Sequence, residues 1–321
     1  MGRFVAARLG HAIVVSFLVT TIAFFLVHLA PGDPFSLDSP RVTEEIRIQW
    51  RHQFGYDRPV AEQYWRYLGS VATGQLGYSH SLHVPVRDAL AVTLPRTLGL
   101  MGSALALSFA LGIWLGVFEA RHSGKRAGRA ANAASLLVNS LPDFWIALMI
   151  LLAFAYWAPI FPAGDITDAF MHQYMSPLRA LWDRIVHLVL PLLSLTLVST
   201  AIIARFQRAA LIDAMPSDYV RTARAKGAPD ASLVRKHALR NALLPMITLA
   251  GLALPALLGG AVFVERIFAW PGMGQMMMTA VGTRDYPLVL AAVLVGSFMV
   301  VAGNALADIG YALADPRIRV R

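Results

Sequence analysis

The chain has 321 residues, of which 57% are hydrophobic and only 15% are charged. Counted with glycine and without tyrosine, the apolar share is roughly 62%, whereas soluble domains hold about 45–50% apolar and about 25% charged residues. This composition excludes a water-soluble globule and a disordered chain. Lysine and arginine number 28 against 19 acidic residues, a net charge of +9, and the absence of cysteine excludes disulfides, cysteine-ligated metals and thiol catalysis.

Six long stretches lack Asp, Glu, Lys and Arg altogether. They are residues 9–32, 97–118, 144–164, 185–204, 241–264 and 286–307. A helix of about 20 residues crosses a hydrocarbon core of about 30 Å, so each stretch is long enough to span a membrane. We expect the third span to start near Asn132 and to contain Pro142 and Asp143. The sequence therefore predicts an all-α, polytopic membrane protein with six transmembrane helices.

Positive charge is concentrated in the segments on one side of these spans. Seventeen of the 28 Lys and Arg residues lie in 1–11, 119–130, 205–241 and 308–321, and four lie in the short loops on the other side. The other seven lie in residues 31–96, a loop long enough to translocate regardless of charge. Because cytoplasmic loops carry the excess of Lys and Arg, both termini are predicted to be cytoplasmic. This distribution also argues against a nucleic-acid partner, which would gather the charge along one face.

The long outer loop contains two predicted amphipathic helices within residues 41–72. Thr43 is placed to cap the first helix and Gly55 to end it. Pro59 opens the second helix, and glycines at 74 and 77 follow it. We expect the pair to lie on the membrane face or on a partner subunit, with a direct substrate site as the alternative.

The cytoplasmic segment 205–245 predicts a helix–turn–helix between two spans. Ser217 is placed to cap a short basic helix that Gly227 ends, and Asp230 to cap a second helix that ends near Pro245. The small residues of the first helix are Ala223, Ala225 and Gly227. They leave little bulk, so another protein could approach the backbone closely. A solvated connector is the alternative.

Charged residues within or beside the spans are functional candidates, because a charge in a bilayer is unfavourable. Asp143 is the deepest and lies beside the helix-bending Pro142; it either lines a pathway or pairs between helices to hold the bundle together. Glu265 and Asp308 are expected to be interfacial. Gly259 and Gly260 permit close helix packing. The segment from Trp270 to Gly274 is expected to form an outer turn, with the tryptophan at the head-group level.

The sequence contains few motifs typical of catalysis, cofactor binding or metal binding. The string at 123–126 lacks the spacing of a phosphate-binding loop, and no metalloprotease or hydrolase motif is found, so we expect no catalytic residue, cofactor or metal on this chain. His80 and His83 form an H-x-x-H pair in the outer loop. Such a pair in a loop is weak support for a transition-metal contact and is more often unliganded.

Residues 218–227 and 237–245 resemble the cytoplasmic EAA loop of ATP-binding-cassette (ABC) importer permeases, in the form found in the dipeptide, oligopeptide and nickel family. Further segments are similar to the B-type permease subunit of that family. They are 30–34 (Ala-Pro-Gly-Asp-Pro), 54–59, 140–145, 268–272 and 315–319. Because these segments cover nearly the whole chain in order, the resemblance is specific for the family, although it does not specify the substrate.

The resemblance implies a type I ABC importer permease in a bacterial or archaeal plasma (inner) membrane. Its expected partners are a second homologous permease, two cytoplasmic ATPases that bind ATP and Mg, an extracytoplasmic solute-binding protein and the lipid bilayer. The ATPase-coupling residues would be Asp218, Tyr219, Arg221, Thr222, Ala223, Lys226 and Gly227. The implied organisation is a tail and first transmembrane helix (1–30), an extracytoplasmic loop (31–96) and a five-helix core (97–321) that contains the coupling loop 205–245.

Di- or oligopeptides are the expected substrate of such a permease, with nickel chelates, glutathione or another small solute as alternatives. The rival class is a self-powered secondary transporter, which would show inverted repeats and more ions buried in its spans. A membrane enzyme is opposed by the missing catalytic motifs. Copurification with ATPase subunits would separate the three classes.

Overall fold

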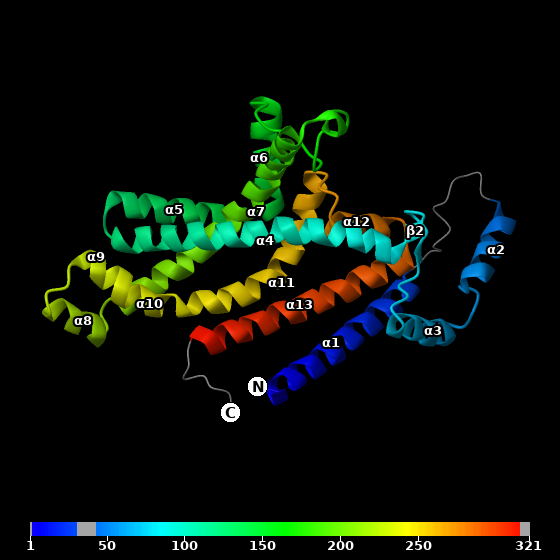
Figure 1. Ribbon diagram of the computed structural model, residues 1–321, viewed down its shortest axis with the longest axis horizontal. Coiled ribbons are helices and arrows are strands. Elements are labelled where there is room, and N and C mark those ends of the chain that lie inside the picture. Colours follow the sequence, from blue (N-terminus) through cyan, green and yellow to red (C-terminus); the bar gives the residue numbers. More distant parts are fainter. Residues whose placement is uncertain (1, 31–42, 315–321) are drawn as a thin grey trace. The chain divides into compact units, whose positions relative to one another are not determined.

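A computed structural model describes residues 2–30 and 43–314, with the backbone alone at residues 2–9, 11, 12, 252–260 and 306–314. The predicted segments 30–34 and 315–319 thus lie wholly or almost wholly outside the described residues. Figure 1 shows a chain that is almost entirely helical. Its elements in chain order are α1 (Gly2–Leu29), α2 (Glu44–Phe54), α3 (Val60–Ala72), β1 (Tyr78–Ser79), β2 (Val84–Pro85), α4 (Val86–Arg121), α5 (Arg126–Ser140), α6 (Asp143–Leu151), the π-helix η1 (Leu152–Trp157), the 3-10 helix η2 (His172–Tyr174), α7 (Pro177–Ala214), α8 (Asp218–Ala225), α9 (Asp230–Ser232), the π-helix η3 (Leu233–Ala238), α10 (Leu239–Ala242), α11 (Leu244–Ile267), α12 (Met273–Gly282) and α13 (Tyr286–Ala314).

The helices belong to two compact units. Unit 1 comprises Met1–Thr97 and Pro271–Val301, and unit 2 comprises Leu98–Trp270 and Ala302–Arg321. The only sheet among the described residues is the short antiparallel pair β1–β2 in unit 1, in which Tyr78 faces Pro85. The all-α prediction is therefore confirmed over this part of the chain.

Three described helical stretches are long and apolar enough to cross a membrane. They are Val86–Arg121, Pro177–Ala214 and Tyr286–Ala305. A fourth candidate is the bent pair Arg126–Ser140 and Asp143–Trp157, and the predicted first and fifth spans lie in α1 and largely in α11. The structure thus confirms a polytopic helical membrane protein.

The third predicted span is not one continuous helix, which corrects the expectation from the sequence. Its two halves meet at 103°. Leu141 and Pro142 both have extended backbones, with ψ of 144° and 138°. Proline lacks the N–H that would continue the helix and disfavours helical geometry in the residue before it. Pro142 and Asp143 therefore lie at a sharp corner and not inside a straight span.

In unit 1 the two amphipathic helices have the predicted bounds, and α3 packs on α1. Gly55 ends α2 with φ of +75°. The Tyr64 hydroxyl lies 2.9 Å from the Thr21 hydroxyl, and the rings of Tyr64 and Phe24 are 5.3 Å apart. The apolar stripe of α3 is thus covered in part by its own chain, whereas we expected the membrane or a partner subunit.

Unit 1 also contains a buried carboxylate that the sequence did not single out. Asp285, just before α13, is 1% exposed. Its Oδ2 accepts hydrogen bonds from the Ser79 hydroxyl at 2.6 Å and from the amide and hydroxyl of Ser81 at 2.9 and 2.8 Å. These bonds fasten the β1–β2 hairpin to the start of the last span.

In unit 2, α4 and α7 approach closely along a row of small residues. Ser108 donates to the Thr196 carbonyl at 3.4 Å. A Cβ placed on Gly112 would lie 2.7 Å from Ile203, and one on Gly116 would lie 2.5 Å from the Ala204 carbonyl oxygen. Small residues four positions apart are a typical helix interface within membranes.

The outer turn predicted at 270–274 is shorter than expected, because α12 already begins at Met273, and its tryptophan is buried. Trp270 is 6% exposed and belongs to the apolar core of unit 2 with Leu100, Ile146 and Leu190. A Cβ on Gly164 would lie 2.6 Å from the Phe268 carbonyl oxygen, and Asp165 donates its amide to that oxygen at 2.9 Å. The loop before α7 docks on this turn, so Trp270 is covered by its own chain, while its expected depth at the head-group level stays a prediction.

Candidate functional site

The short helix α8 lies at the predicted place in the cytoplasmic segment, beyond the end of α7 (Figure 1). The Ser217 carbonyl accepts the amides of Val220 and Arg221 at 3.1 and 3.0 Å, which starts the helix. The Ser217 hydroxyl donates backwards to the Ala214 carbonyl at 2.6 Å. Ser217 therefore occupies the N-cap position, as predicted, but its side chain joins α8 to α7 and does not cap the helix.

Gly227 ends α8 by a specific backbone motif. Its φ is +80°. The amide of Gly227 donates to the Arg224 carbonyl at 3.0 Å, and the amide of Ala228 donates to the Ala223 carbonyl at 3.2 Å. This pair of bonds is the Schellman motif, which favours glycine at the left-handed position. The predicted role of Gly227 as the helix terminator is confirmed.

One face of α8 is seated on its own chain. Val220 and Ala223 are buried in a cluster with Leu211 of α7, Leu233 of η3 and Ala242 of α10. Val117 and Ala120, at the end of α4, pack against the same cluster. We call this the seat of α8; through it α8 contacts α4, α7 and the segment that leads into α11.

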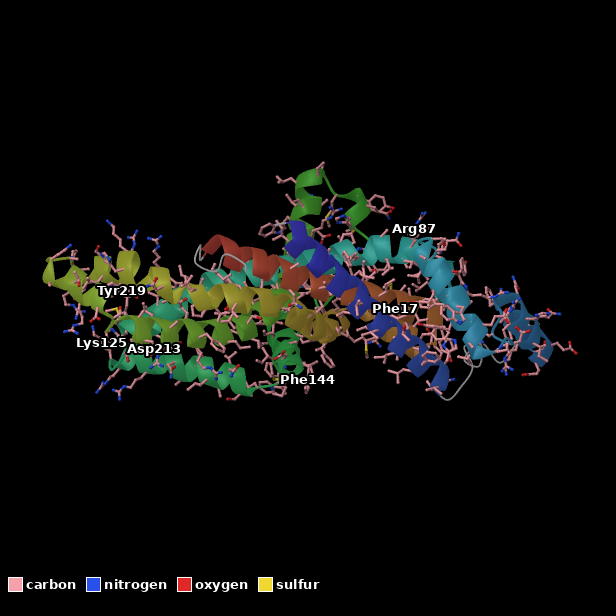
Figure 2. All side chains as sticks on the ribbon, turned by 90° about the horizontal axis from the view of Figure 1, so that it is seen from below. Phe17, Arg87, Lys125, Phe144, Asp213 and Tyr219 are labelled. Carbon is pink, nitrogen blue, oxygen red and sulfur yellow. The ribbon has the colours of Figure 1, made fainter. Side chains whose placement is uncertain are left out.

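The opposite face of α8 is exposed. It carries Asp218, Tyr219, Arg221, Thr222, Arg224, Lys226 and Gly227. Figure 2 labels Tyr219, together with Lys125 and Asp213, at this end of unit 2. Ala223 differs from the other predicted coupling residues because it faces inward at 8% exposure. Its small side chain therefore permits close packing on the seat, and does not leave room for an approaching partner as we expected.

The exposed face is net basic. The Arg221 guanidinium lies 3.4 Å from the Asp218 carboxylate, and the two side chains are 74% and 97% exposed. Such a solvated pair contributes little to stability. Arg224 and Lys226 add positive charge beside it. The face is therefore suited to contact an acidic or polar protein surface.

The second cytoplasmic helix runs without a break from Asp230 to Ala242 and ends near Pro245, as predicted, although Pro229 and not Asp230 occupies its N-cap position. It consists of α9, the π-helical η3 and α10, and it ends before Pro245, which lies in the first turn of α11. A proline is favoured in the first turn of a helix, where its missing N–H has no partner to lose. Pro245 therefore starts the next helix and does not end the previous one.

The predicted pathway and bundle candidates lie in or beside two helices that pack together, α6 and α11. Pro142 and Asp143 are exposed at the corner before α6. Gly259 and Gly260 lie within α11, in the part where the backbone alone is described, and the Asp308 side chain lies outside the description. Glu265 is 0% exposed and is therefore enclosed by its own chain, while its expected place at the membrane interface stays a prediction.

Two buried polar residues were missed from the sequence. Glu119 of α4 is fully buried, and its Oε1 accepts the Ser135 hydroxyl of α5 at 2.7 Å. Gln207 of α7 is also fully buried, and neither amide atom of its side chain has a hydrogen-bond partner among the described residues. Both lie just beyond the predicted apolar spans. A search of the sequence for stretches without charged residues therefore does not detect them.

The histidine pair of the outer loop does not form part of a metal-ligating cluster in the described chain. No group of three or more His, Cys, Asp or Glu side chains suited to a metal occurs in the part that the structure describes. The His80 ring packs edge-on against Phe54, with ring centroids 4.4 Å apart. Its position is thus explained by aromatic packing within unit 1.

Comparison with known families covers almost the whole chain. Residues 108–320 match the family described as binding-protein-dependent transport system inner membrane component. Residues 1–101 match the family described as the N-terminal part of such membrane components.

Several curated proteins are similar over their full length. The oligopeptide transport system permease protein AppB of Bacillus subtilis is 34% identical, with 99% of each chain covered. The di/tripeptide transport system permease protein DppB of Pseudomonas aeruginosa is 37% identical, again with 99% of each covered. The glutathione transport system permease protein GsiC of Escherichia coli is 32% identical over 100% of each chain.

Among solved structures, a chain of the MetNI methionine ABC transporter in an inward-facing conformation is similar in fold. The TM-score is 0.53 at 18% identity, over 70% of this chain and 98% of that chain. The likeness supports the helical permease fold and does not bear on the substrate.

Proposed function

Because the chain belongs to the family of binding-protein-dependent transport system inner membrane components, we propose that it imports di- or oligopeptides as one of two permeases in an ABC importer. It is a multi-pass permease subunit of a bacterial cytoplasmic membrane, and its family works with an ATPase and a substrate-binding protein. The proposed finer points are the substrate class, the pairing with a second, homologous permease, and the docking of two ATPases on the cytoplasmic side.

The peptide assignment is supported by the names of the full-length relatives. Two of the three described above are peptide permeases, and the third is a glutathione permease. Glutathione is itself a tripeptide derivative, so the three substrates share amide and carboxylate groups. The alternative substrates within this proposal are glutathione, nickel chelates and other small solutes.

The observation that carries the coupling role is the two-faced geometry of α8. Its exposed basic face is free to enter a cleft on an ATPase, while Val220 and Ala223 hold the opposite face in the seat. Because the seat joins the ends of α4 and α7, a displacement of α8 would move these spans with it. This chain would then transmit the free energy of ATP hydrolysis without binding ATP or Mg itself.

The proposed cycle is an exchange between two states of the permease pair. ATP binding closes the ATPase dimer, draws the two coupling helices together and opens the pathway outward. The binding protein then releases its substrate, and hydrolysis restores the inward-facing state. Ligands can drive this exchange only if the two states are close in free energy.

The proposal is tested by purifying the complex through a tag on this chain and reconstituting it in proteoliposomes with its binding protein. We expect ATPase subunits to copurify, and labelled dipeptide uptake to require ATP and the binding protein. Uptake experiments with labelled glutathione and with a nickel chelate, under the same conditions, identify the substrate class. Uptake that needs neither ATP nor ATPase subunits would contradict the importer assignment and favour a secondary transporter.

A further inference from the structure

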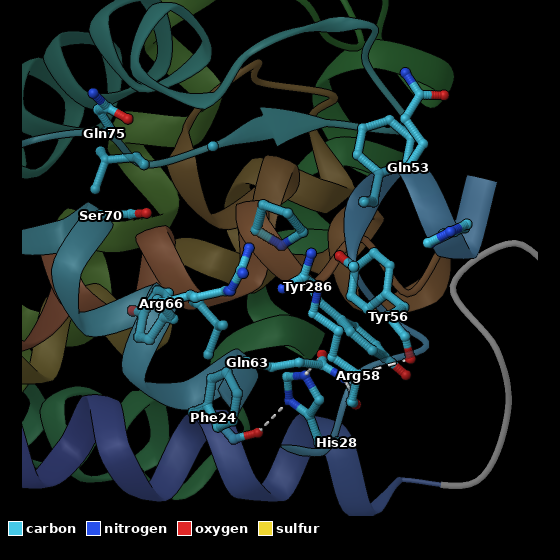
Figure 3. Close-up of a pocket in the computed structure, with 18 residues that line it drawn as sticks. Phe24, His28, Gln53, Tyr56, Arg58, Gln63, Arg66, Ser70, Gln75 and Tyr286 are labelled. Carbon is cyan, nitrogen blue, oxygen red and sulfur yellow. Dashed lines mark hydrogen bonds between the residues drawn. The ribbon is translucent and has the colours of Figure 1, made fainter. Parts of the chain in front are cut away.

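Unit 1 contains a cavity of about 330 Å³ at the outer ends of α1 and α13. Figure 3 shows that its walls come from the end of α1, the end of α2 with the turn that follows, α3, the segment 75–77 after α3, and the start of α13. Its volume is at the lower end of the range for small-molecule pockets, about 300–1,000 Å³. Its lining shares no residue with the coupling segment 205–245.

The polar groups around the cavity favour a negatively charged ligand. Arg58 and Arg66 line it, and no Asp or Glu is among its described lining residues. Both guanidinium groups contact one carboxylate outside the lining, that of Glu62, at 2.5 and 3.1 Å. The hydrogen bond from Arg58 holds the pKa of Glu62 below its ordinary value of 4.5, so this carboxylate stays ionised at neutral pH. The lining itself thus has two arginines and no carboxylate, whereas the carboxylates of Glu62 and Asp57, the latter 3.0 Å from the His52 ring, lie outside it.

A buried hydroxyl adds a donor without a partner. The Tyr67 hydroxyl oxygen is buried and has no hydrogen-bond partner in the described chain, and the ring stacks on Phe24 with centroids 5.5 Å apart. Burial raises the pKa of Tyr67 to about 12, so the hydroxyl keeps its proton at neutral pH. A buried donor without an acceptor is unfavourable, and a ligand oxygen in the cavity would satisfy it.

Hydrogen bonds hold together the part of the cavity wall that is formed by the end of α1, by α3 and by the turn before α3. The two ring nitrogens of His28 lie 2.8 Å from the Phe24 carbonyl and 3.2 Å from Gln63 Oε1. The amide nitrogen of Gln63 donates to the Arg58 carbonyl at 2.8 Å. These bonds tie α3 and the turn before it to the end of α1, so the cavity has a defined shape before a ligand binds.

The cavity is also amphipathic. Its floor includes Phe24 of α1 and Pro287 and Leu290 of α13, which belong to membrane-spanning helices. Phe17 lies two turns before Phe24 on the same face of α1, and its side chain is exposed on the surface of the chain. A ligand that combines an anionic head with an apolar tail would match both the arginines and the floor.

We propose that this cavity binds the phosphate head group of an anionic phospholipid from the outer leaflet, with the acyl chains along α1. Basic pockets between transmembrane helices bind anionic lipid head groups on the cytoplasmic side of membranes, and the same charge complementarity would act in a basic pocket on the outer side. A peptide fits less well, because its terminal ammonium group needs an acidic partner and the described lining offers none. The bound lipid would hold the outer helices α2 and α3 against the membrane surface.

The test uses the intact complex, purified through this chain and reconstituted in nanodiscs of phosphatidylcholine with graded phosphatidylglycerol. Native mass spectrometry counts the phosphatidylglycerol molecules retained by each variant. We expect the double variant R58Q/R66Q to lower the affinity at this site by about tenfold or more, since charge-assisted hydrogen bonds are the strong ones. The milder Y67F removes only the hydroxyl and is expected to lower the affinity by roughly threefold.

The matched control is R87Q, because Arg87 is an exposed arginine of the same unit that does not line the cavity. It should retain phosphatidylglycerol like the unmodified chain. Glycerol 3-phosphate distinguishes a lipid site from a soluble phosphate site: we expect weak competition from it, because it lacks the acyl chains. Equal lipid retention by R58Q/R66Q, Y67F and R87Q would overturn the proposal, as would saturable binding of a labelled dipeptide that these cavity variants abolish.

Discussion

At the scale of single residues, Gly227 is needed for its backbone conformation and not for lack of space. A Cβ at this position would have no neighbour within 4 Å, yet its φ of +80° lies in the left-handed region. A branched side chain is strained there by about 1–2 kcal/mol, whereas asparagine tolerates this conformation. The requirement therefore concerns the Schellman motif that ends α8.

This distinction predicts different results for two substitutions of Gly227. We expect Gly227→Val to lower peptide uptake per ATP hydrolysed several-fold, because the end of α8 is displaced, while the chain still inserts. Gly227→Asn should keep most of the coupling. The ratio of uptake to hydrolysis in proteoliposomes is the measurement. Equal losses in both variants would indicate that side-chain bulk at the ATPase contact matters, and not the backbone.

Asp285 is predicted to hold the outer hairpin. Asp285→Ala leaves the buried Ser79 hydroxyl without its acceptor at 2.6 Å, and an unsatisfied buried group destabilises by about 1–3 kcal/mol. We expect faster proteolysis between β1 and β2 and a lower unfolding temperature in detergent. Asp88→Ala, which removes an exposed carboxylate of the same unit, should change neither.

The loop before α7 is expected to respond to pH through Asp168. Hydrogen bonds from the amides of Met171 and Phe170 hold the pKa of this carboxyl below its ordinary value of 3.8. A carboxyl group whose pKa is lower in the folded than in the unfolded state stabilises the fold at pH values above its unfolded-state pKa. That stabilisation is lost as the pH falls through the folded-state pKa. Protease protection of the loop should therefore be constant from pH 7 down to about 4 and fall below that. Asp168→Ala should remove the stabilisation of the loop by this carboxylate at neutral pH and so lower its protection from protease. A variant that keeps full protease protection would contradict this role.

At the scale of elements, the contact between α4 and α7 depends on Gly116. A Cβ there would lie 2.5 Å from the Ala204 carbonyl oxygen and 2.7 Å from Gln207. The two helices would have to separate, which destabilises by about 1–3 kcal/mol. Gly102, on the same helix, has no neighbour within 4 Å of such a Cβ.

These two glycines form a matched pair for substitution. Gly116→Ala should lower the unfolding temperature, while Gly102→Ala should leave it unchanged or raise it slightly, because alanine favours a helix by about 0.5–1 kcal/mol over glycine. Thermal unfolding of the purified complex measures both. A Gly116→Ala variant as stable as Gly102→Ala would show that the close approach is not required.

Element ends were predictable from the sequence because their signals are local. Gly55 and Gly227 end α2 and α8 at the predicted places. The corner at Pro142 was misjudged, because a proline within an apolar run is compatible with a kinked span as well as with a 103° turn. The burial of Trp270 and Glu265 could not be predicted either, since it depends on a loop and helices distant in sequence that pack over them.

The candidate site was predictable in position but not in orientation. Composition and capping residues indicate a small basic helix at 218–227, and six of its seven candidate residues are exposed. The inward direction of Ala223 depends on the seat, whose members come from α4, α7, η3 and α10. No local pattern specifies that assembly. The cavity of unit 1 was missed for the same reason, because its lining is drawn from three separate stretches of sequence.

At the scale of the whole molecule, the positive charge has two explanations. Seventeen of the 28 cations lie on the cytoplasmic side, eight of them between residues 205 and 241. They orient the chain in the membrane and also provide the basic face of α8. The arginines of the outer loop include Arg58 and Arg66, which would bind an anionic lipid. A net charge of +9 is thus compatible with membrane and protein partners and requires no nucleic acid.

The central claim is that α8 transmits ATP hydrolysis by partner subunits to peptide uptake through this chain. The most direct measurement is the number of peptides imported per ATP hydrolysed, in proteoliposomes that contain the complete transporter, for a Tyr219→Ala/Arg221→Ala variant. Tyr174→Ala, which changes an exposed tyrosine of η2 in the loop before α7, is the control. We predict that the ratio falls several-fold in the α8 variant with ATPase activity retained, and that it is unchanged in the control. An unchanged ratio in the α8 variant, or peptide uptake without ATP, would contradict the account.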